Sequence, residues 1–198
     1  MSQAKILTDK EYRKVLLHIA RKNHHARNKL LINLSHAAGM RVGEIASLTI
    51  KHVLTEDGTI KDEFFLSKNE TKGNRGRTVL LSQKLRDEIH EYLTFRFQLK
   101  DLAILNYTNL NRPLIYSQKS ETGFSANSLA QWFGLTYRAA GLHGCSSHSG
   151  RRKFATTLSQ NAVNPKIIQK LLGHRQIQTT FLYVQVSPTS LRKAVELF

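Results

Sequence analysis

The stretch that decides the fold is Ser146–Val186, SSHSGRRKFATTLSQNAVNPKIIQKLLGHRQIQTTFLYVQV. Its first half predicts a helix in which Arg151 shares a face with Phe154 and Leu158, at spacings of three and seven residues. His148 precedes Arg151 by three residues and lies on the same line. A guanidinium on an inward face is costly unless an anionic group meets it. Two partners remain open, a local carboxylate in an internal ion pair or an outside anion such as phosphate.

The second half of the stretch carries a short helix and a corner. Asn164-Pro165 is typical of a helix start, and Gly173 is placed to end that helix. His174 therefore lies at a helix end, where a favourable contact with the helix dipole would be enough to explain it.

Tyr183 follows His174 by nine residues. The apolar stripe expected around it consists of Ile177, Phe181 and Val184. Tyr183 falls well to one side of that stripe, so it is either an ordinary packing or exposed ring, or a hydroxyl that faces the basic pocket. We favour the second interpretation, an oxygen nucleophile beside a phosphate clamp.

A second arginine lies in the segment 40–48, MRVGEIASL. As a short helix, this segment aligns Arg41 with Ile45 and Leu48 and turns the arginine inward. Glu44, three residues later, has two open roles. It either neutralises Arg41, or it holds the guanidinium in position while the fork stays free for a ligand.

Helical periodicity dominates the remaining chain, with β-like runs in residues 51–81 and a further short strand expected at residues 113–116. Thr8–Glu11 reads as a capping box, and Ser82 and Ser125 as helix N-caps. Lys72 lies in the glycine-punctuated turn TKGNRGR at residues 71–77. That turn is either a solvated loop or a basic hairpin that reaches over a nucleic-acid backbone, with Lys72 bringing an ammonium to a leaving oxygen. We therefore expect a mainly α (α+β) helical bundle with a small antiparallel sheet or hairpin near residues 50–81.

The charge balance points to a polyanionic partner. In 198 residues, 30 Lys and Arg face 14 Asp and Glu, which gives a formal net charge of +16. A folded domain with this surplus repels itself, and a nucleic acid relieves the repulsion. A solvated basic surface without a partner is the alternative. A membrane surface is disfavoured, because no basic amphipathic stretch stands out and no apolar stretch is long enough to span a bilayer.

Cysteine and histidine usage argues against a metal site. Cys145 is the only cysteine, so no intramolecular disulfide forms and a reducing cytoplasm fits. Its spacing to His143 and His148 matches no common structural zinc pattern. Other histidines, His36 among them, are expected at the surface or at helix ends.

Taken together, these residues resemble the catalytic set of the tyrosine recombinases, also called the phage integrase family. The motifs that carry the resemblance are Gly39-Met40-Arg41-Val42-Gly43-Glu44, Thr71-Lys72-Gly73-Asn74, Ser147-His148-Ser149-Gly150-Arg151, Leu172-Gly173-His174, Thr179-Thr180 and Tyr183. They span nearly the whole chain in the family's order. His-x-x-Arg alone is a weak signal, but six positions at compatible spacing are a strong one.

The resemblance implies a mechanism and a role for each residue. Tyr183 is the nucleophile that attacks a DNA phosphate and forms a 3′-phosphotyrosyl link. Arg41, Arg151 and His174 bind the phosphate, and Glu44 supports Arg41. His148 takes the tyrosine proton. Lys72 protonates the leaving 5′-oxygen.

The resemblance also implies a setting for the reaction. We expect residues 1–198 to form a single catalytic domain without the family's usual N-terminal core-binding domain, acting in the cytoplasm on double-stranded DNA. The expected assembly is a tetramer on paired sites, with a monomer as the alternative for the isolated domain. No metal, ATP or other cofactor is expected, because the chain lacks the clustered carboxylates of two-metal nucleases. Two rival functions stay open: a non-catalytic DNA-binding module, and a type IB topoisomerase-like enzyme that works without pairing of sites.

Overall fold

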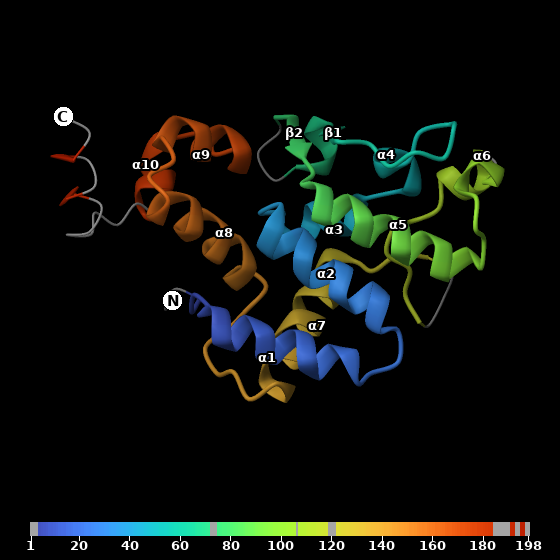
Figure 1. Ribbon diagram of the computed structural model, residues 1–198, viewed down its shortest axis with the longest axis horizontal. Coiled ribbons are helices and arrows are strands. Elements are labelled where there is room, and N and C mark those ends of the chain that lie inside the picture. The colour runs from blue at the N-terminus through green and yellow to red at the C-terminus, as the bar shows by residue number, and fades with distance from the viewer. Residues whose placement is uncertain are drawn as a thin grey trace.

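The computed structural model of the chain describes residues 4–71, 75–105, 107–118, 122–183, 191–192 and 195–196. Within these ranges helices predominate, and a two-stranded antiparallel sheet lies at one edge of the molecule (Figure 1). The α-helices are α1 (Asp9–Ala20), α2 (His25–Ala37), α3 (Val42–Ser47), α4 (Ile50–Val53), α5 (Gln83–Phe97), α6 (Tyr107–Leu110), α7 (Ala126–Ala139), α8 (Ser149–Gln160), α9 (Pro165–Leu172) and α10 (Ile177–Phe181). The strands are β1 (Glu63–Leu66) and β2 (Arg77–Leu80), and 3-10 helices cover Lys68–Glu70 and Leu102–Ile104. The predicted fold class is confirmed.

Local chemistry sets the helix boundaries. Thr8 and Glu11 form the expected capping box of α1, each side chain accepting from the other residue's backbone N–H. Ser82 and Ser125 cap α5 and α7 through their hydroxyls. At the other end of a helix, Gly173 follows α9 in the left-handed region, with φ at 62°.

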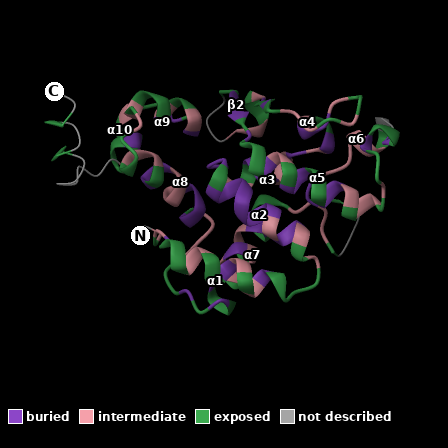
Figure 2. Cartoon of the chain, viewed as in Figure 1, coloured by how far each residue is buried: buried purple, intermediate pink, exposed green. Residues whose placement is uncertain are grey.

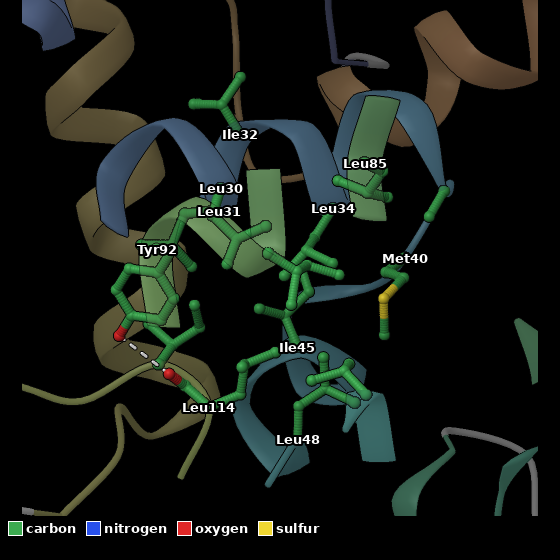
Figure 3. Packing of buried hydrophobic residues seen from close by; sticks show 14 of the residues in the cluster. Leu30, Leu31, Ile32, Leu34, Met40, Ile45, Leu48, Leu85, Tyr92 and Leu114 are labelled. Atoms are coloured by element: carbon green, nitrogen blue, oxygen red, sulfur yellow. Dashed lines mark hydrogen bonds between the residues drawn. The ribbon is translucent and has the colours of Figure 1, made fainter. Parts of the chain in front are cut away.

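Helix α2 is the centre of the molecule. It packs against α1, α3, α5 and α8, so its apolar residues point in several directions, as in a helix buried on most sides (Figure 1). Figure 3 shows Leu30, Leu31 and Leu34 of α2 meeting side chains from α3 and α5. The hydroxyl of Tyr92 on α5 donates to the carbonyl of Leu114 at 2.9 Å, which satisfies its one polar atom inside this core (Figure 3).

Burial follows the same arrangement, with buried residues along α2 and on the faces of its neighbours (Figure 2). His36 on α2 is among them. Its Nε2 lies 3.0 Å from the hydroxyl of Tyr137, and burial lowers the pKa of its ring to about 3. His36 lies in the last turn of α2, so the expected helix-end position is confirmed. The expected surface position is wrong, because α8 covers this side of α2.

Helices α8 and α9 enclose a second, smaller apolar cluster. Ala155, Ile168 and Leu172 are its buried members, and Tyr183 packs against them. The apolar stripe predicted from Ile177, Phe181 and Val184 was wrong at Phe181, because the side chain of this residue is 53% exposed. Helix α10 spans only five residues and turns Thr180 inward instead, because its hydroxyl meets the ring of His174. Val184 lies outside the described residues.

The β1–β2 hairpin lies next to α9 (Figure 1). Its register pairs Glu63 with Leu80 and Leu66 with Arg77. The inward face is apolar except for Arg77, which is buried. Lys72, in the connection between the strands, lies outside the described residues.

Within the described part of the chain, no helix has both the length and the apolar character needed to cross a bilayer.

Candidate active site

Arg151 lies in the first turn of α8 with only 4% of its surface exposed. Its Nη1 donates to the carbonyl of Gly39 at 2.6 Å, and its Nη2 donates to the carbonyl of Leu172 at 2.5 Å. Both acceptors stand at helix ends, where backbone carbonyls lack intrahelical partners. The guanidinium therefore joins the ends of α2 and α9 to the start of α8.

These partners decide between the two interpretations of Arg151. No ion pair found among the described residues includes Arg151, so the local carboxylate is not its direct partner. Burial, and next the charge of Arg41, lower the pKa of Arg151 to about 9, which leaves it protonated at pH 7. Two neutral carbonyls do not cancel a full charge. The site retains an attraction for an outside anion.

Arg41 differs in position from the sequence prediction. It is the N-cap of α3, with an extended backbone at φ −80° and ψ 153°, and its side chain is 25% exposed. It is therefore not aligned with Ile45 and Leu48 inside a helix. The helix begins one residue later because the Glu44 carboxylate accepts from the Arg41 backbone N–H at 2.9 Å.

Glu44 binds two arginines at once. Its Oε1 accepts from Nη1 of Arg41 at 2.9 Å, and its Oε2 accepts from Nη2 of Arg77 at 2.7 Å. Burial alone would raise the pKa of the Glu44 carboxyl, but hydrogen bonds and charge from Arg77 bring that pKa below its usual value. Glu44 thus neutralises part of the charge of Arg41 and holds it by one terminal nitrogen. That the rest of the Arg41 guanidinium binds a ligand stays a prediction.

Arg77 is the residue that sequence reasoning missed. It was grouped with the cations of the 71–77 turn, yet it begins β2 and is only 7% exposed. The available signal was the two-residue period of the strand, which places Arg77 on the same face as Val79.

His174 follows α9 and is 8% exposed. Its Nδ1 lies 2.9 Å from the hydroxyl of Thr180. Burial, followed by the charges of Arg151 and Arg41, lowers the pKa of His174 to about 4. The ring is therefore neutral at pH 7, so the contact with the helix dipole, which favours an imidazolium, is not its role.

Tyr183 lies directly beside His174. The two rings stack with their centroids 6.0 Å apart and an interplanar angle of 22°. The guanidinium of Arg152 lies 5.9 Å from the centroid of the Tyr183 ring. The side chain is partly exposed, and Tyr183 acts electrostatically on Arg151, so an accessible phenol lies near the buried cations.

A cleft of about 1140 Å³ opens next to these residues, between the hairpin and α9. Arg41, Arg77 and His174 form part of its wall. Its other cationic lining residues are Arg75, Lys166, Lys170 and Arg175, and Glu63 supplies an acidic group. A cleft with this charge favours an extended anion.

Comparison with known proteins identifies the chain. A model of the phage integrase family matches residues 5–190. The chain belongs to the phage integrase family. Its membership rests on the whole length of the match, which includes every residue of the candidate site.

Similar integrase-family proteins include tyrosine recombinases from archaea and bacteria. The chain is 31% identical over 201 residues to tyrosine recombinase XerA of Pyrococcus horikoshii, covering 98% of this chain and 61% of the relative. It is 30% identical over 165 residues to tyrosine recombinase XerC of Lactobacillus leichmannii, covering 81% of this chain and 51% of the relative. The chain thus spans about three fifths or less of the length of these curated relatives.

Solved integrase-family structures share the fold. A crystal structure of XerA recombinase superposes with a TM-score of 0.72 at 19% identity, covering 100% of this chain and 64% of that one. The Tn1549 transposon integrase, in complex with a circular intermediate DNA, gives a TM-score of 0.75 at 18% identity, covering 100% of this chain and 67% of that one.

Two members of the expected integrase set remain, His148 and Lys72. His148 is the exposed N-cap of α8, and its backbone N–H donates to the hydroxyl of Ser146 at 3.3 Å. It lies one turn before Arg151 on the same helix. Lys72 cannot be placed, since it lies outside the described residues. In the described ranges, no group of three or more His, Cys, Asp or Glu side chains is arranged to hold a metal ion.

Proposed function

We propose that this chain is the strand-cleaving domain of a site-specific DNA recombinase, which cuts and rejoins DNA through a tyrosyl ester. One observation carries the proposal. Two buried or half-buried guanidiniums, Arg41 and Arg151, are grouped with neutral His174 and an accessible Tyr183 phenol beside a cation-lined cleft. That set combines an anion clamp with a nucleophile, which is what phosphoryl transfer requires.

The proposed reaction is a transesterification. Tyr183 Oη attacks the phosphorus of a DNA phosphodiester, its proton passes to His148, and a 3′-phosphotyrosyl bond forms. The bond from phosphorus to the 5′-oxygen breaks, and Lys72 supplies the proton that converts this oxygen to a hydroxyl. A 5′-hydroxyl from a partner strand then attacks in reverse, so bond energy is conserved without ATP.

The arginines supply most of the rate enhancement in this mechanism. A phenol of pKa about 10 is ionised in only about one molecule in a thousand at pH 7, a shortfall of roughly 4 kcal/mol. Arg41 and Arg151 hold the non-bridging oxygens and stabilise the charge that develops on them. Neutral His174 adds a hydrogen bond to the same phosphate, while Thr180 fixes the orientation of its ring.

The proposal includes the partners and the setting. Double-stranded DNA is the substrate, in keeping with the DNA held by the similar Tn1549 integrase structure. Two paired sites would gather four copies of the chain, and residues 1–198 would act in the cytoplasm as one catalytic domain. No metal takes part in the proposed steps.

A nicked suicide substrate tests the proposal, because loss of a short strand traps the tyrosyl ester. We expect the wild-type chain to form a covalent protein–DNA adduct in excess chelator. Tyr183→Phe should fold and bind the same DNA, yet form no adduct. Tyr116→Phe is the matched control, since it removes a phenol that contacts His24 at the N-terminal end of α2, opposite to the end that Arg151 contacts, and it should form the adduct as the wild type does.

The same assay separates the rival functions. DNA binding without an adduct, on any cognate site, would favour the non-catalytic module. Relaxation of supercoiled plasmids that carry no special site would favour the topoisomerase. Adduct formation by Tyr183→Phe would assign the nucleophile to another residue.

A further inference from the structure

All three guanidinium nitrogens of Arg77 donate hydrogen bonds to two neighbours inside the site, Glu44 and Leu171. Its Nε donates to Oε1 of Glu44 at 3.3 Å and its Nη2 to Oε2 at 2.7 Å, so the pair is bidentate. Its Nη1 donates to the carbonyl of Leu171 at 2.6 Å. Bidentate pairs fix the orientation of both groups as well as their separation.

The chain makes room for this side chain at a glycine. A Cβ built at Gly173 would lie 2.6 Å from Cδ of Arg77, so the stem of Arg77 lies directly against the corner before His174. The Arg77 side chain is 5% exposed. It is therefore fixed by packing and by hydrogen bonds, and it presents almost nothing to a ligand in the cleft.

Three elements of the site thus meet at one buried group. Arg77 begins β2, the strand that follows the Lys72 turn. Through Glu44 it reaches Arg41 at the start of α3. Through Leu171 it reaches the end of α9, which leads into His174.

Resting on the proposed function, we infer that Arg77 is a positioning residue for DNA cleavage. It prevents Glu44 from rotating, so that Arg41 presents its guanidinium to the phosphate, and it keeps the start of β2 against the corner that leads into His174. Arg77 itself does not touch the DNA.

An arginine is needed for this task. Lysine would restore the charge as a single point, but it cannot bind both oxygens of Glu44 and the Leu171 carbonyl in one plane. The positive charge of Arg77 and the planar shape of its guanidinium therefore have separate effects, on the pKa of His174 and on the cleavage rate. Two substitutions, one that removes the charge and one that keeps it, distinguish these effects.

The experiment compares Arg77→Gln and Arg77→Lys with Arg75→Gln as the matched control. Arg75 loses the same charge two residues away, but it is exposed and belongs to the cleft wall. Three quantities are measured for each variant: the Kd for the nicked substrate, the single-turnover rate of adduct formation at saturating DNA, and the pKa of His174 by NMR titration of the free protein.

We expect Arg77→Gln to lower the saturating rate by up to about 100-fold, because a misplacement of about 1 Å in a reacting group can cost that much, while Kd changes only a few-fold. The pKa of His174 should rise from about 4, because Arg77 is one of the charges that lower it. Arg77→Lys should keep the pKa of His174 near the wild-type value without recovering the rate. Arg75→Gln should raise Kd and leave the pKa of His174 in place.

A wild-type rate in Arg77→Gln, or full recovery in Arg77→Lys, would overturn the inference. If Arg77→Gln does not fold, Arg77→Lys decides the question, since only its rate tests the fork. The NMR titration needs no cleavage. If the wild-type chain forms no adduct, the proposed function is refuted. If the pKa of His174 is unchanged in Arg77→Gln, the position of Arg77 next to His174 is refuted, whatever the adduct assay shows.

Discussion

Glu44 is the single residue on which the balance of charge in the site depends. It is 1% exposed and binds both Arg41 and Arg77, while Arg151 lowers its pKa from nearby. Three guanidiniums around one carboxylate leave a surplus of positive charge that favours a bound anion. Removing the carboxylate would leave buried cations without a counter-charge, which is the costly case for buried ion pairs.

We therefore expect Glu44→Gln to lower the free energy of unfolding by about 3–5 kcal/mol. Urea denaturation at pH 7 measures this loss. Glu63→Gln is the control, because that side chain is exposed and its loss should change the free energy of unfolding by less than about 0.5 kcal/mol. Equal stabilities for the two variants would contradict the charge balance described here.

At the scale of elements, the contact between α2 and α8 holds Arg151 in place. Gly150 lets the two helices approach closely, since a Cβ at this position would lie 2.4 Å from Oγ of Ser35 and 2.6 Å from Cδ2 of His36. Both neighbours are buried, so neither can move out into solvent. A larger residue would push the start of α8, and Arg151 with it, away from the ends of α2 and α9.

We expect Gly150→Val to lower the free energy of unfolding by about 1–3 kcal/mol, the usual cost of overpacking. Gly134→Ala is a matched control in the middle of α7, where a Cβ would meet nothing within 4 Å. It should raise stability by up to about 1 kcal/mol, because alanine is the better helix former. Calorimetric melting of both variants measures the difference, and a stabilised Gly150→Val would show that the helices do not meet at this glycine.

The elements also show what sequence reasoning reached. Capping residues such as Thr8, and the glycine at the end of α9, act locally, so their pattern predicted the boundaries well. The apolar stripe predicted for α10 was wrong because five residues are too few to define a stripe, and a single hydrogen bond between Thr180 and His174 sets the orientation of the helix. The predicted position of Arg41 inside the helix was wrong for a similar reason. Arg41 is the N-cap because the Glu44 carboxylate accepts a hydrogen bond from its backbone N–H.

The candidate site was predictable in part for the same reason. The inward-facing Arg151 could be recognised from the period of its own helix. Arg77 could not be linked to Glu44 from the sequence, because the pair is 33 residues apart and joins a strand to a helix. Contacts of that kind depend on tertiary packing, which no local pattern encodes.

Across the whole molecule, the surplus of +16 charges governs association. We expect the affinity for duplex DNA to fall steeply with salt, because binding releases counterions from each neutralised phosphate. Six to ten phosphate contacts would lower the affinity by about 10³ to 10⁵ between 50 and 200 mM salt. Fluorescence anisotropy across this range measures the slope, and a flat dependence would mean that the basic surface does not bind the backbone.

Acid should destabilise the whole fold through its buried histidines. The pKa of His36 falls to about 3 and that of His174 to about 4 on folding, both chiefly through burial, from a usual value of 6.5. Below pH 6.5 these two histidines therefore bind protons in the unfolded chain but stay neutral in the folded chain until the pH approaches 4 and 3. Stability is full above pH 6.5 and declines as the pH falls toward 4 and 3, by up to about 1.4 kcal/mol per pH unit for each histidine.

His36→Phe tests this dependence by removing one of the two titrations. The variant should be less stable at pH 7, because it loses the bond to Tyr137, but its free energy of unfolding should fall less steeply between pH 6.5 and 4. Urea titrations at a series of pH values give both slopes. Parallel slopes in wild type and variant would exclude His36 as a source of acid sensitivity.

The bonds from Arg151 to the carbonyls of Gly39 and Leu172 bear on how related sequences should be interpreted. A side chain that fastens three helices together will be retained by descendants that have abandoned strand exchange, since losing it would endanger their folding. Its presence in a distant homologue is thus a poor indicator of enzymatic competence. The ring of Tyr183 packs against the cluster of α8 and α9, but under the proposed function its phenolic oxygen is the reacting atom, so Tyr183 is the more telling position to inspect.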